Sequence, residues 1–213
     1  MKYEFTGEVK VVFGITLKQI RALVSFDSVA KGEIGGWIEG EKNLSQVSGN
    51  AWVYGDARVS GNAWVYGDAR VYGDAWVYGD AWVSGDAWVY GDARVSGNAR
   101  VYGDAWVSGN AWVYGNARVY GDAWVSGNAW VYGDARVSGN AWVYGNASII
   151  YLGTPNGFGA CCYQVSKGFR IQVGCRYFTM KEARAHWKGK KDRREVMAAL
   201  DYAQAIIKLR GWK

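Results

Sequence analysis

Residues 49–60 read Gly-Asn-Ala-Trp-Val-Tyr-Gly-Asp-Ala-Arg-Val-Ser, two copies of one six-residue phrase. The phrase, Gly-(Asn/Asp)-Ala-(Trp/Arg)-Val-(Tyr/Ser), recurs seventeen times from Gly49 to Ile150 without an insertion. Its last copy, residues 145–150, is degraded, and so is the leading segment 43–48. An unbroken short period with atypical end copies predicts a solenoid whose terminal coils are capped.

The order of residues within the phrase predicts one short strand and one corner. Ala51 and Val53 stand two residues apart and should point into a core, while Trp52 and Tyr54 should point to solvent. The following Gly-Asp pair tolerates turn conformations. Because one phrase buries almost nothing alone, three phrases should wind into a triangular coil, and the coils should stack as parallel strands about 4.8 Å apart. The eighteen phrases from 43 to 150 then give six coils.

The aliphatic residue with a small residue two positions earlier resembles the hexapeptide-repeat left-handed β-helix family. Here these positions are Val53 and Ala51 and their equivalents in later copies. The resemblance implies a left-handed coil, although crossovers between parallel strands are usually right-handed. We therefore expect a mainly β fold, a single-stranded left-handed parallel β-helix with a small N-terminal cap and a C-terminal α+β domain.

The segments before the array carry a closer resemblance, to bacterial and prophage-encoded repeat proteins, some of which carry a transferase label. The matching segments are Lys2–Thr6, Ile20–Leu23, Gly35–Glu39 and Asn43–Ser45. This resemblance implies that a mobile element encodes the chain and that it binds a host component.

The chain divides into a cap at 1–42, the β-helix at 43–150 and a basic α+β domain at 151–213. In the cap, residues 3–5 and 9–13 flank Thr6-Gly7-Glu8 in a pattern that predicts a β-hairpin. The spacing of apolar residues in 17–24 fits either a helix or a strand. Trp37 is expected to cover the open end of the Ala/Val core.

Beyond the array, three strands are expected at 148–152, 160–165 and 169–173, forming a small antiparallel sheet. Thr179 predicts the start of a helix that ends at Trp187, and Asp192 predicts a second helix over 193–210. The second helix is amphipathic, with Val196, Leu200, Ala203, Ile207 and Arg210 on or near one face. It should either dock on the small sheet or pack against another subunit.

Catalytic residues are missing from the array. The acyltransferases of the resembled family use a histidine base and loops that interrupt the repeats. Residues 43–148 contain no His, Cys, Lys, Glu or Pro, and the only histidine is His186 in the predicted tail helix. We therefore predict a non-enzymatic binding or scaffold protein with no catalytic residue and no cofactor. The alternative is an acyltransferase-like enzyme that depends on His186.

The cysteines favour buried thiols over a metal site. Cys161, Cys162 and Cys175 all follow the array, and neither they nor His186 show the Cys-x-x-Cys spacing typical of zinc sites. We expect no bound metal. Reduced thiols, the absence of a secretory leader and the absence of a long apolar run predict a cytoplasmic protein that does not bind membranes.

Residues eighteen apart should stack on one face, so the outward Trp/Arg positions should form three ladders. They are Trp52, Arg70, Trp88, Trp106, Trp124 and Trp142; Arg58, Trp76, Arg94, Trp112 and Trp130; and Trp64, Trp82, Arg100, Arg118 and Arg136. Stacked aromatic rings and arginines stabilise such a prism by themselves. Exposed Trp and Arg also dominate binding interfaces, so the expected binding platform is Trp88, Trp106, Trp124, Trp142, Arg100, Arg118 and Arg136. Asp104, Asp122 and Asp134 are expected to neutralise its arginines.

The positive charge belongs to the tail. Residues 1–42 are neutral overall, 43–148 carry a net −3 and 149–213 carry a net +9. The densest basic patch is Lys188, Lys190, Lys191, Arg193 and Arg194. It is either a solvated helix face or a site for a nucleotide or nucleic acid. The expected partners are therefore a foreign protein, further copies of the chain in a dimer or trimer, or a nucleotide-type ligand.

Overall fold

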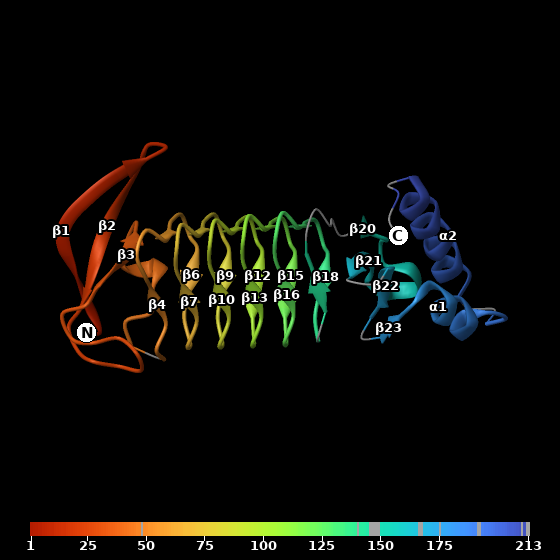
Figure 1. Ribbon diagram of the computed structural model, residues 1–213, viewed down its shortest axis with the longest axis horizontal. Helices are drawn as coiled ribbons and strands as arrows, with labels where there is room; N and C mark the ends of the chain where they lie inside the picture. Colours follow the sequence, from red (N-terminus) through yellow and green to blue (C-terminus); the bar gives the residue numbers. More distant parts are fainter. Residues whose placement is uncertain are drawn as a thin grey trace.

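The structure is a computed structural model that describes residues 1–47, 49–139, 141–144, 150–165, 168–174, 176–190, 193–209 and 211. The molecule is a rod, with a β-hairpin at one end, a solenoid in the middle and a small sheet with two helices at the other end (Figure 1). The prediction of a mainly β chain built on a parallel β-solenoid of about six coils is confirmed.

The solenoid has three faces, each a parallel sheet. The Trp face consists of β4 (Trp52–Val53), β7 (Arg70–Val71), β10 (Trp88–Val89), β13 (Trp106–Val107), β16 (Trp124–Val125) and β19 (Trp142–Val143). The hairpin face consists of β3 (Ile34–Ile38), β5 (Arg58–Val59), β8 (Trp76–Val77), β11 (Arg94–Val95), β14 (Trp112–Val113) and β17 (Trp130–Val131). The Arg face consists of β6 (Trp64–Val65), β9 (Trp82–Val83), β12 (Arg100–Tyr102), β15 (Arg118–Tyr120) and β18 (Arg136–Val137).

Each phrase folds as its pattern predicts. The Ala and Val side chains of the described copies lie in one continuous buried core along the rod. The N–H of the outward residue donates to the Ala carbonyl of the next coil, as from Trp88 to Ala105 at 2.9 Å. The glycine at each described corner, from Gly49 to Gly139, has a positive φ, which is +66° at Gly85. A Cβ at Gly85 would lie 2.9 Å from the backbone nitrogen of Gly103, so glycine is required there by both conformation and space.

The N-terminal hairpin turns at a different place from the one predicted. Strand β1 (Tyr3–Val12) continues through Thr6–Glu8, and the turn to β2 (Ile15–Ala22) is made by Phe13 and Gly14, with φ values of 50° and 77°. Gly7, with φ 95°, lies where the register shifts between Phe5 and Val9. The glycine therefore makes a bulge within one long strand, and the prediction of a turn at 6–8 is wrong. The ambiguous segment 17–24 is a strand up to Ala22.

Trp37 does not cover the open end of the core, so that prediction is also wrong. It occupies an outward position on β3, in register with Arg58, and the Lys10 Nζ lies 4.1 Å from its ring centroid. The 3-10 helix η1 (Glu41–Asn43) and Leu44 lead from this coil to the Arg face, where Leu44 bridges to Val65. The cover is instead made by the hairpin and its loops.

Trp52 is fully buried, although its position in the phrase predicts an exposed side chain. Its ring contacts Tyr3 and Phe26 edge-on, with centroids 6.2 and 5.5 Å away. A Cβ on Gly35 would lie 2.7 Å from the Trp52 ring, so glycine permits this close approach. The cap thus folds over the first rung of the Trp face and buries it.

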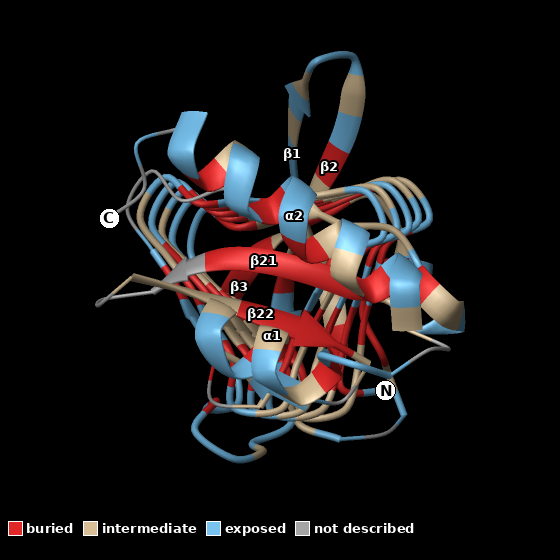
Figure 2. Cartoon of the chain, turned by 90° about the vertical axis from the view of Figure 1, so that its right-hand side faces the viewer, coloured by how far each residue is buried: buried red, intermediate tan, exposed pale blue. Residues whose placement is uncertain are grey.

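The other end of the solenoid is closed by a small antiparallel sheet, in the order β20 (Ile150–Tyr151), β21 (Ala160–Val165), β22 (Gly168–Val173), β23 (Arg176–Phe178). The 3-10 helix η2 (Pro155–Gly157) joins the first two strands. Cys161 and Tyr163 on β21 belong to the solenoid core, while Ala160 and Cys162 face a second core with the helices. The sheet therefore forms a layer between the solenoid and the helices (Figure 2). The predicted strand start at Ser148 lies outside the described residues.

Helices α1 (Met180–Trp187) and α2 (Arg194–Leu209) cover the outer side of the sheet. The buried positions of α2 are Val196, Leu200, Ala203 and Ile207, so the predicted face docks within the chain. Asp192 and Arg210 lie outside the described residues. None of the described helices is long and apolar enough to span a membrane.

Thr179 begins α1 as predicted, and its hydroxyl accepts a hydrogen bond from the Glu182 N–H at 3.2 Å. We expect Thr179→Ala to lower the free energy of unfolding of the C-terminal domain by about 1 kcal/mol, because this N–H loses its partner. Thr154 precedes η2 without a side-chain cap and provides the control. Thermal unfolding followed by circular dichroism should show a loss only for Thr179→Ala, and equal losses in both variants would contradict the capping role.

Candidate binding surfaces

The Trp face carries four consecutive stacked indoles. Trp88, Trp106, Trp124 and Trp142 pair in register across β10, β13, β16 and β19, as their eighteen-residue spacing predicts. Their ring centroids are 5.1, 4.7 and 5.2 Å apart, with interplanar angles of 3°, 5° and 10°. The cross-strand backbone pairing at about 4.8 Å fixes this stack at nearly the ideal separation of aromatic rings.

The stack becomes more exposed towards the C-terminal end of the rod. Trp88 and Trp106 are half-buried, Trp124 is 37% exposed and Trp142 is 52% exposed. Trp124 and Trp142 line an open hollow of about 300 Å³ together with Ser126 and Tyr144. No charged side chain interrupts these four rungs. This part of the face is therefore an apolar strip.

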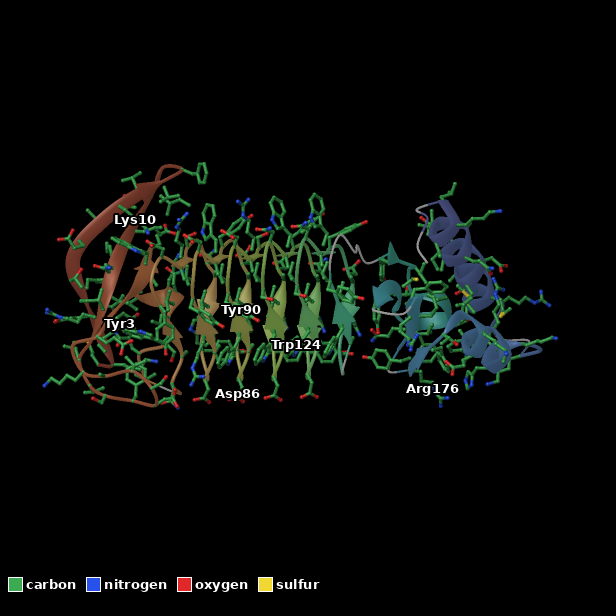
Figure 3. The ribbon with its side chains drawn as sticks, viewed as in Figure 1. Tyr3, Lys10, Asp86, Tyr90, Trp124 and Arg176 are labelled. Carbon is green, nitrogen blue, oxygen red and sulfur yellow. The ribbon has the colours of Figure 1, made fainter. Side chains whose placement is uncertain are left out.

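Carboxylates border the strip at the corner between the Arg and Trp faces. The exposed side chains of Asp86, Asp104 and Asp122 occupy equivalent positions in successive coils. Asp86 projects from the lower edge of the solenoid in Figure 3, which also labels Trp124. Within the part of the chain that the structure describes, none of the three forms a salt bridge. The strip thus combines aromatic rings with a row of negative charge.

The Arg face holds Arg100, Arg118 and Arg136 side by side in register. The Arg100 guanidinium lies 4.8 Å from the Trp82 ring centroid. The expected neutralisation of these arginines by Asp104, Asp122 and Asp134 is not observed, because no described ion pair joins the two sets within 4 Å. The aspartates lie at the corners, whereas the arginines extend from the middle of the face.

Tyr102 and Tyr120 stack beside these arginines, with ring centroids 5.0 Å apart. Partial burial raises the pKa of Tyr102, and the three arginines oppose this shift. Arg100, Arg118 and Tyr102 line a hollow of about 200 Å³ with Tyr66, Trp82 and Ser84.

The N-terminal hairpin covers part of the hairpin face. Phe13, at the tip of the hairpin, stacks on Trp76 with centroids 5.7 Å apart. Further along, Trp112 and Trp130 stack at 5.4 Å, and the Arg94 guanidinium lies 4.9 Å from the Trp112 ring. The sequence did not indicate that the hairpin would lean over this face, since nothing local to the array encodes it.

The basic patch is spread over two hollows at the far end of the rod. Lys190 and Arg193 line one of about 360 Å³, and Lys188, Lys190 and Arg194 line another of about 480 Å³ that also contains Asp201. Lys191 lies outside the described residues. The first hollow also contains Arg176 from β23 and His186 from α1. Arg176 stands outside the run of basic residues in the sequence, and only the fold brings β23 beside that run.

His186 lies between cations. Its Nε2 is 3.3 Å from Arg176 Nη1 and 3.4 Å from Lys190 Nζ, and its ring packs against Phe178 and Trp187. Desolvation first, and then the charges of Lys190 and Arg176, lower the pKa of His186. The imidazole is therefore mostly neutral at pH 7.

Cys161 and Cys162 cannot share a metal ion, because adjacent residues of β21 point to opposite sides of the sheet. Burial raises the pKa of the Cys161 thiol to about 11. Among the described residues, no group of three or more His, Cys, Asp or Glu is placed to hold a metal ion. Cys175 lies outside the described residues.

Comparison with known proteins identifies the repeat and nothing more specific. No curated protein matches the chain significantly. Six segments match the family model described as YdcK beta solenoid repeat, namely residues 45–61, 51–67, 63–79, 93–109, 111–127 and 129–145. All six lie in the array and together span about two fifths of the chain. The array is therefore a β-solenoid repeat of the kind that this family model describes.

Proposed function

We propose that this chain is a non-enzymatic scaffold whose Trp face binds a basic surface of a partner protein. The observation that carries the proposal is the stack from Trp88 to Trp142, in which four indole rings lie nearly parallel to one another along one face of the solenoid. Large exposed aromatic patches are uncommon on protein surfaces and typically mark interaction sites, where Trp is one of the residues that contribute most to binding.

The charge around the strip favours a basic partner. Arg and Lys side chains bind over indole rings by cation–π attraction, and the row of Asp86, Asp104 and Asp122 adds a complementary negative edge. One cation–π contact of this kind already occurs within the chain, where the Arg70 guanidinium lies 5.1 Å from the Trp88 ring centroid. Among the described residues, no cation lies over the rings of Trp106, Trp124 and Trp142, so we expect these rings to accept one from a partner.

We infer that the coil is left-handed, since the Ala/Val phrase resembles the hexapeptide repeats. We also infer that a prophage or similar element encodes the protein and that it acts in the cytoplasm on a host protein. The resemblance of the segments before the array supports the origin, and the buried Cys161 thiol supports a reducing compartment.

The test replaces the centre of the strip and follows what the protein captures. Immobilised wild type and the variant Trp106→Ser with Trp124→Ser are exposed to bacterial lysate, and captured proteins are identified by mass spectrometry. We expect the variant to capture at least tenfold smaller amounts of the basic proteins that the wild type retains, because the two central rings of the strip are gone. Circular dichroism should show an intact solenoid, since the Ala/Val core is unchanged.

Trp112→Ser with Trp130→Ser removes the same stacked pair from the hairpin face and serves as the matched control. It should capture the same proteins as wild type. Light scattering of the purified chain tests the alternative that a second copy of the chain binds the Trp face. If the wild type has a multiple of the monomer mass and only the Trp106→Ser, Trp124→Ser variant is monomeric, the face serves self-association. That result, or identical capture by both variants, would overturn the proposal.

A further inference from the structure

The first hollow of the basic patch is lined by residues of the C-terminal domain, and none of them belongs to the solenoid. Its walls come from the loop before β21, the end of β22, the edge strand β23, the end of α1 and the segment between α1 and α2. The functional groups around it are Phe158, Arg176, His186, Trp187, Lys190 and Arg193. A volume of about 360 Å³ lies in the range of small-ligand sites. Arg176 is at the open edge of the sheet (Figure 3).

The hollow gathers positive charge without a carboxylate among its described lining residues. The described acidic residues of this domain are engaged elsewhere. Glu182 caps α1, Glu195 accepts a hydrogen bond from the Asn156 N–H at 2.6 Å, and Asp201 accepts one from Arg184 at 2.7 Å. Arg176 and Lys190 converge on the imidazole of His186 in one concave site, and the two cations repel each other unless an anion joins them.

The same hollow has an aromatic wall. Phe158 is 43% exposed, and the guanidinium of Arg193 lies 5.3 Å from its ring centroid. A Cβ at Gly174 would lie 3.3 Å from the Phe158 ring, so glycine allows this ring to lie close to the sheet. Trp187 is buried beneath the site. A flat ring that enters along Phe158 would find stacking partners in Phe158 and Arg193, as nucleobases do on aromatic and guanidinium surfaces.

We propose that this hollow binds a mononucleotide, with its phosphate held by Arg176, His186 and Lys190 and its base against Phe158. Arg176 supplies planar paired donors suited to phosphate oxygens, and Lys190 supplies a mobile point charge. The anion separates cations that otherwise face each other across His186. This site is independent of the Trp face, so either can fail without the other.

Isothermal titration calorimetry with adenosine monophosphate, adenosine and inorganic phosphate tests the proposal. We expect the nucleotide to bind at least tenfold more tightly than either of its parts, because only it reaches both the cations and the aromatic wall. Arg176→Gln with Lys190→Gln should weaken nucleotide binding at least tenfold. Phe158→Leu should weaken binding of the nucleotide towards that of phosphate while leaving phosphate itself unaffected.

Lys181→Gln with Lys208→Gln removes two exposed positive charges of the same domain outside the hollow and is the matched control. It should bind the nucleotide as wild type does. Equal affinity in the two double variants would overturn the site, because attraction would then come from net charge alone. Absence of nucleotide binding to the folded wild type would overturn it as well.

A second readout follows from His186, whose described charged neighbours in the hollow are Arg176, Lys190 and Arg193. Desolvation and the charges of Lys190 and Arg176 lower the pKa of His186, whereas the negative charge of a bound phosphate raises it, so the imidazole should take up a proton on binding near pH 7. Titrations in buffers of different ionisation enthalpy should show this uptake in wild type and lose it in His186→Gln. Uptake that persists unchanged in His186→Gln would overturn the placement of the phosphate beside this residue.

Discussion

Replacing Trp52 by alanine should lower the free energy of unfolding by about 3–5 kcal/mol, the cost of deleting a fully buried tryptophan. Trp52 has no exposed surface and holds Tyr3 and Phe26 on the first coil. Its removal leaves a cavity between the cap and the solenoid. The loss should be measured by chemical denaturation, with hydrogen exchange to show that protection falls first in β1–β4, because solenoids unfold in parts.

Trp130→Ala is the matched control, since it removes the same residue from the same position of the phrase. Trp130 is 46% exposed and stacks on Trp112. Its loss should cost clearly less than that of Trp52, because each aromatic pair adds only about 0.5–1.5 kcal/mol and almost half of the Trp130 surface is already exposed. Similar losses for Trp52→Ala and Trp130→Ala would contradict the burial of Trp52 under the cap.

Gly85→Ala should destabilise the middle of the solenoid almost as strongly. An alanine at φ +66° costs about 1–2 kcal/mol. Its Cβ would also lie 2.9 Å from the nitrogen of Gly103, which forces neighbouring coils apart and adds about 1–3 kcal/mol. The two terms should lower the denaturation midpoint and expose the amides of β10 and β13 to exchange.

Gly55→Ala separates the two causes. Gly55 has a similar φ of +57°, yet a Cβ there would meet nothing within 4 Å. It should therefore lose only the conformational part, about 1–2 kcal/mol. A loss at Gly55 as large as that at Gly85 would show that the backbone angle alone explains the glycine ladder.

Of the two candidate sites, the sequence predicts the Trp stack but not the hollow around His186. The stack from Trp88 to Trp142 follows from an eighteen-residue period, because a fixed number of residues per coil places equivalent positions one strand apart. The hollow around His186 does not follow from any period. Its members Phe158, Arg176 and Arg193 stand in three separate segments, and only packing of the helices on the small sheet joins them.

The phrase by itself determined the solenoid, its buried Ala/Val core, its glycine corners and the three ladders of outward residues, since each depends on contacts that repeat with the sequence. Tertiary structure alone decided which outward residues are exposed. Trp52 and Trp130 are the same residue in the same phrase, yet one is buried and the other is 46% exposed, because the cap folds onto the rung of Trp52 and does not contact Trp130. The physical reason is that the eighteen-residue period sets which residues lie next to each other on neighbouring coils. Which coils are covered depends instead on how the non-repeating segments at the two ends fold.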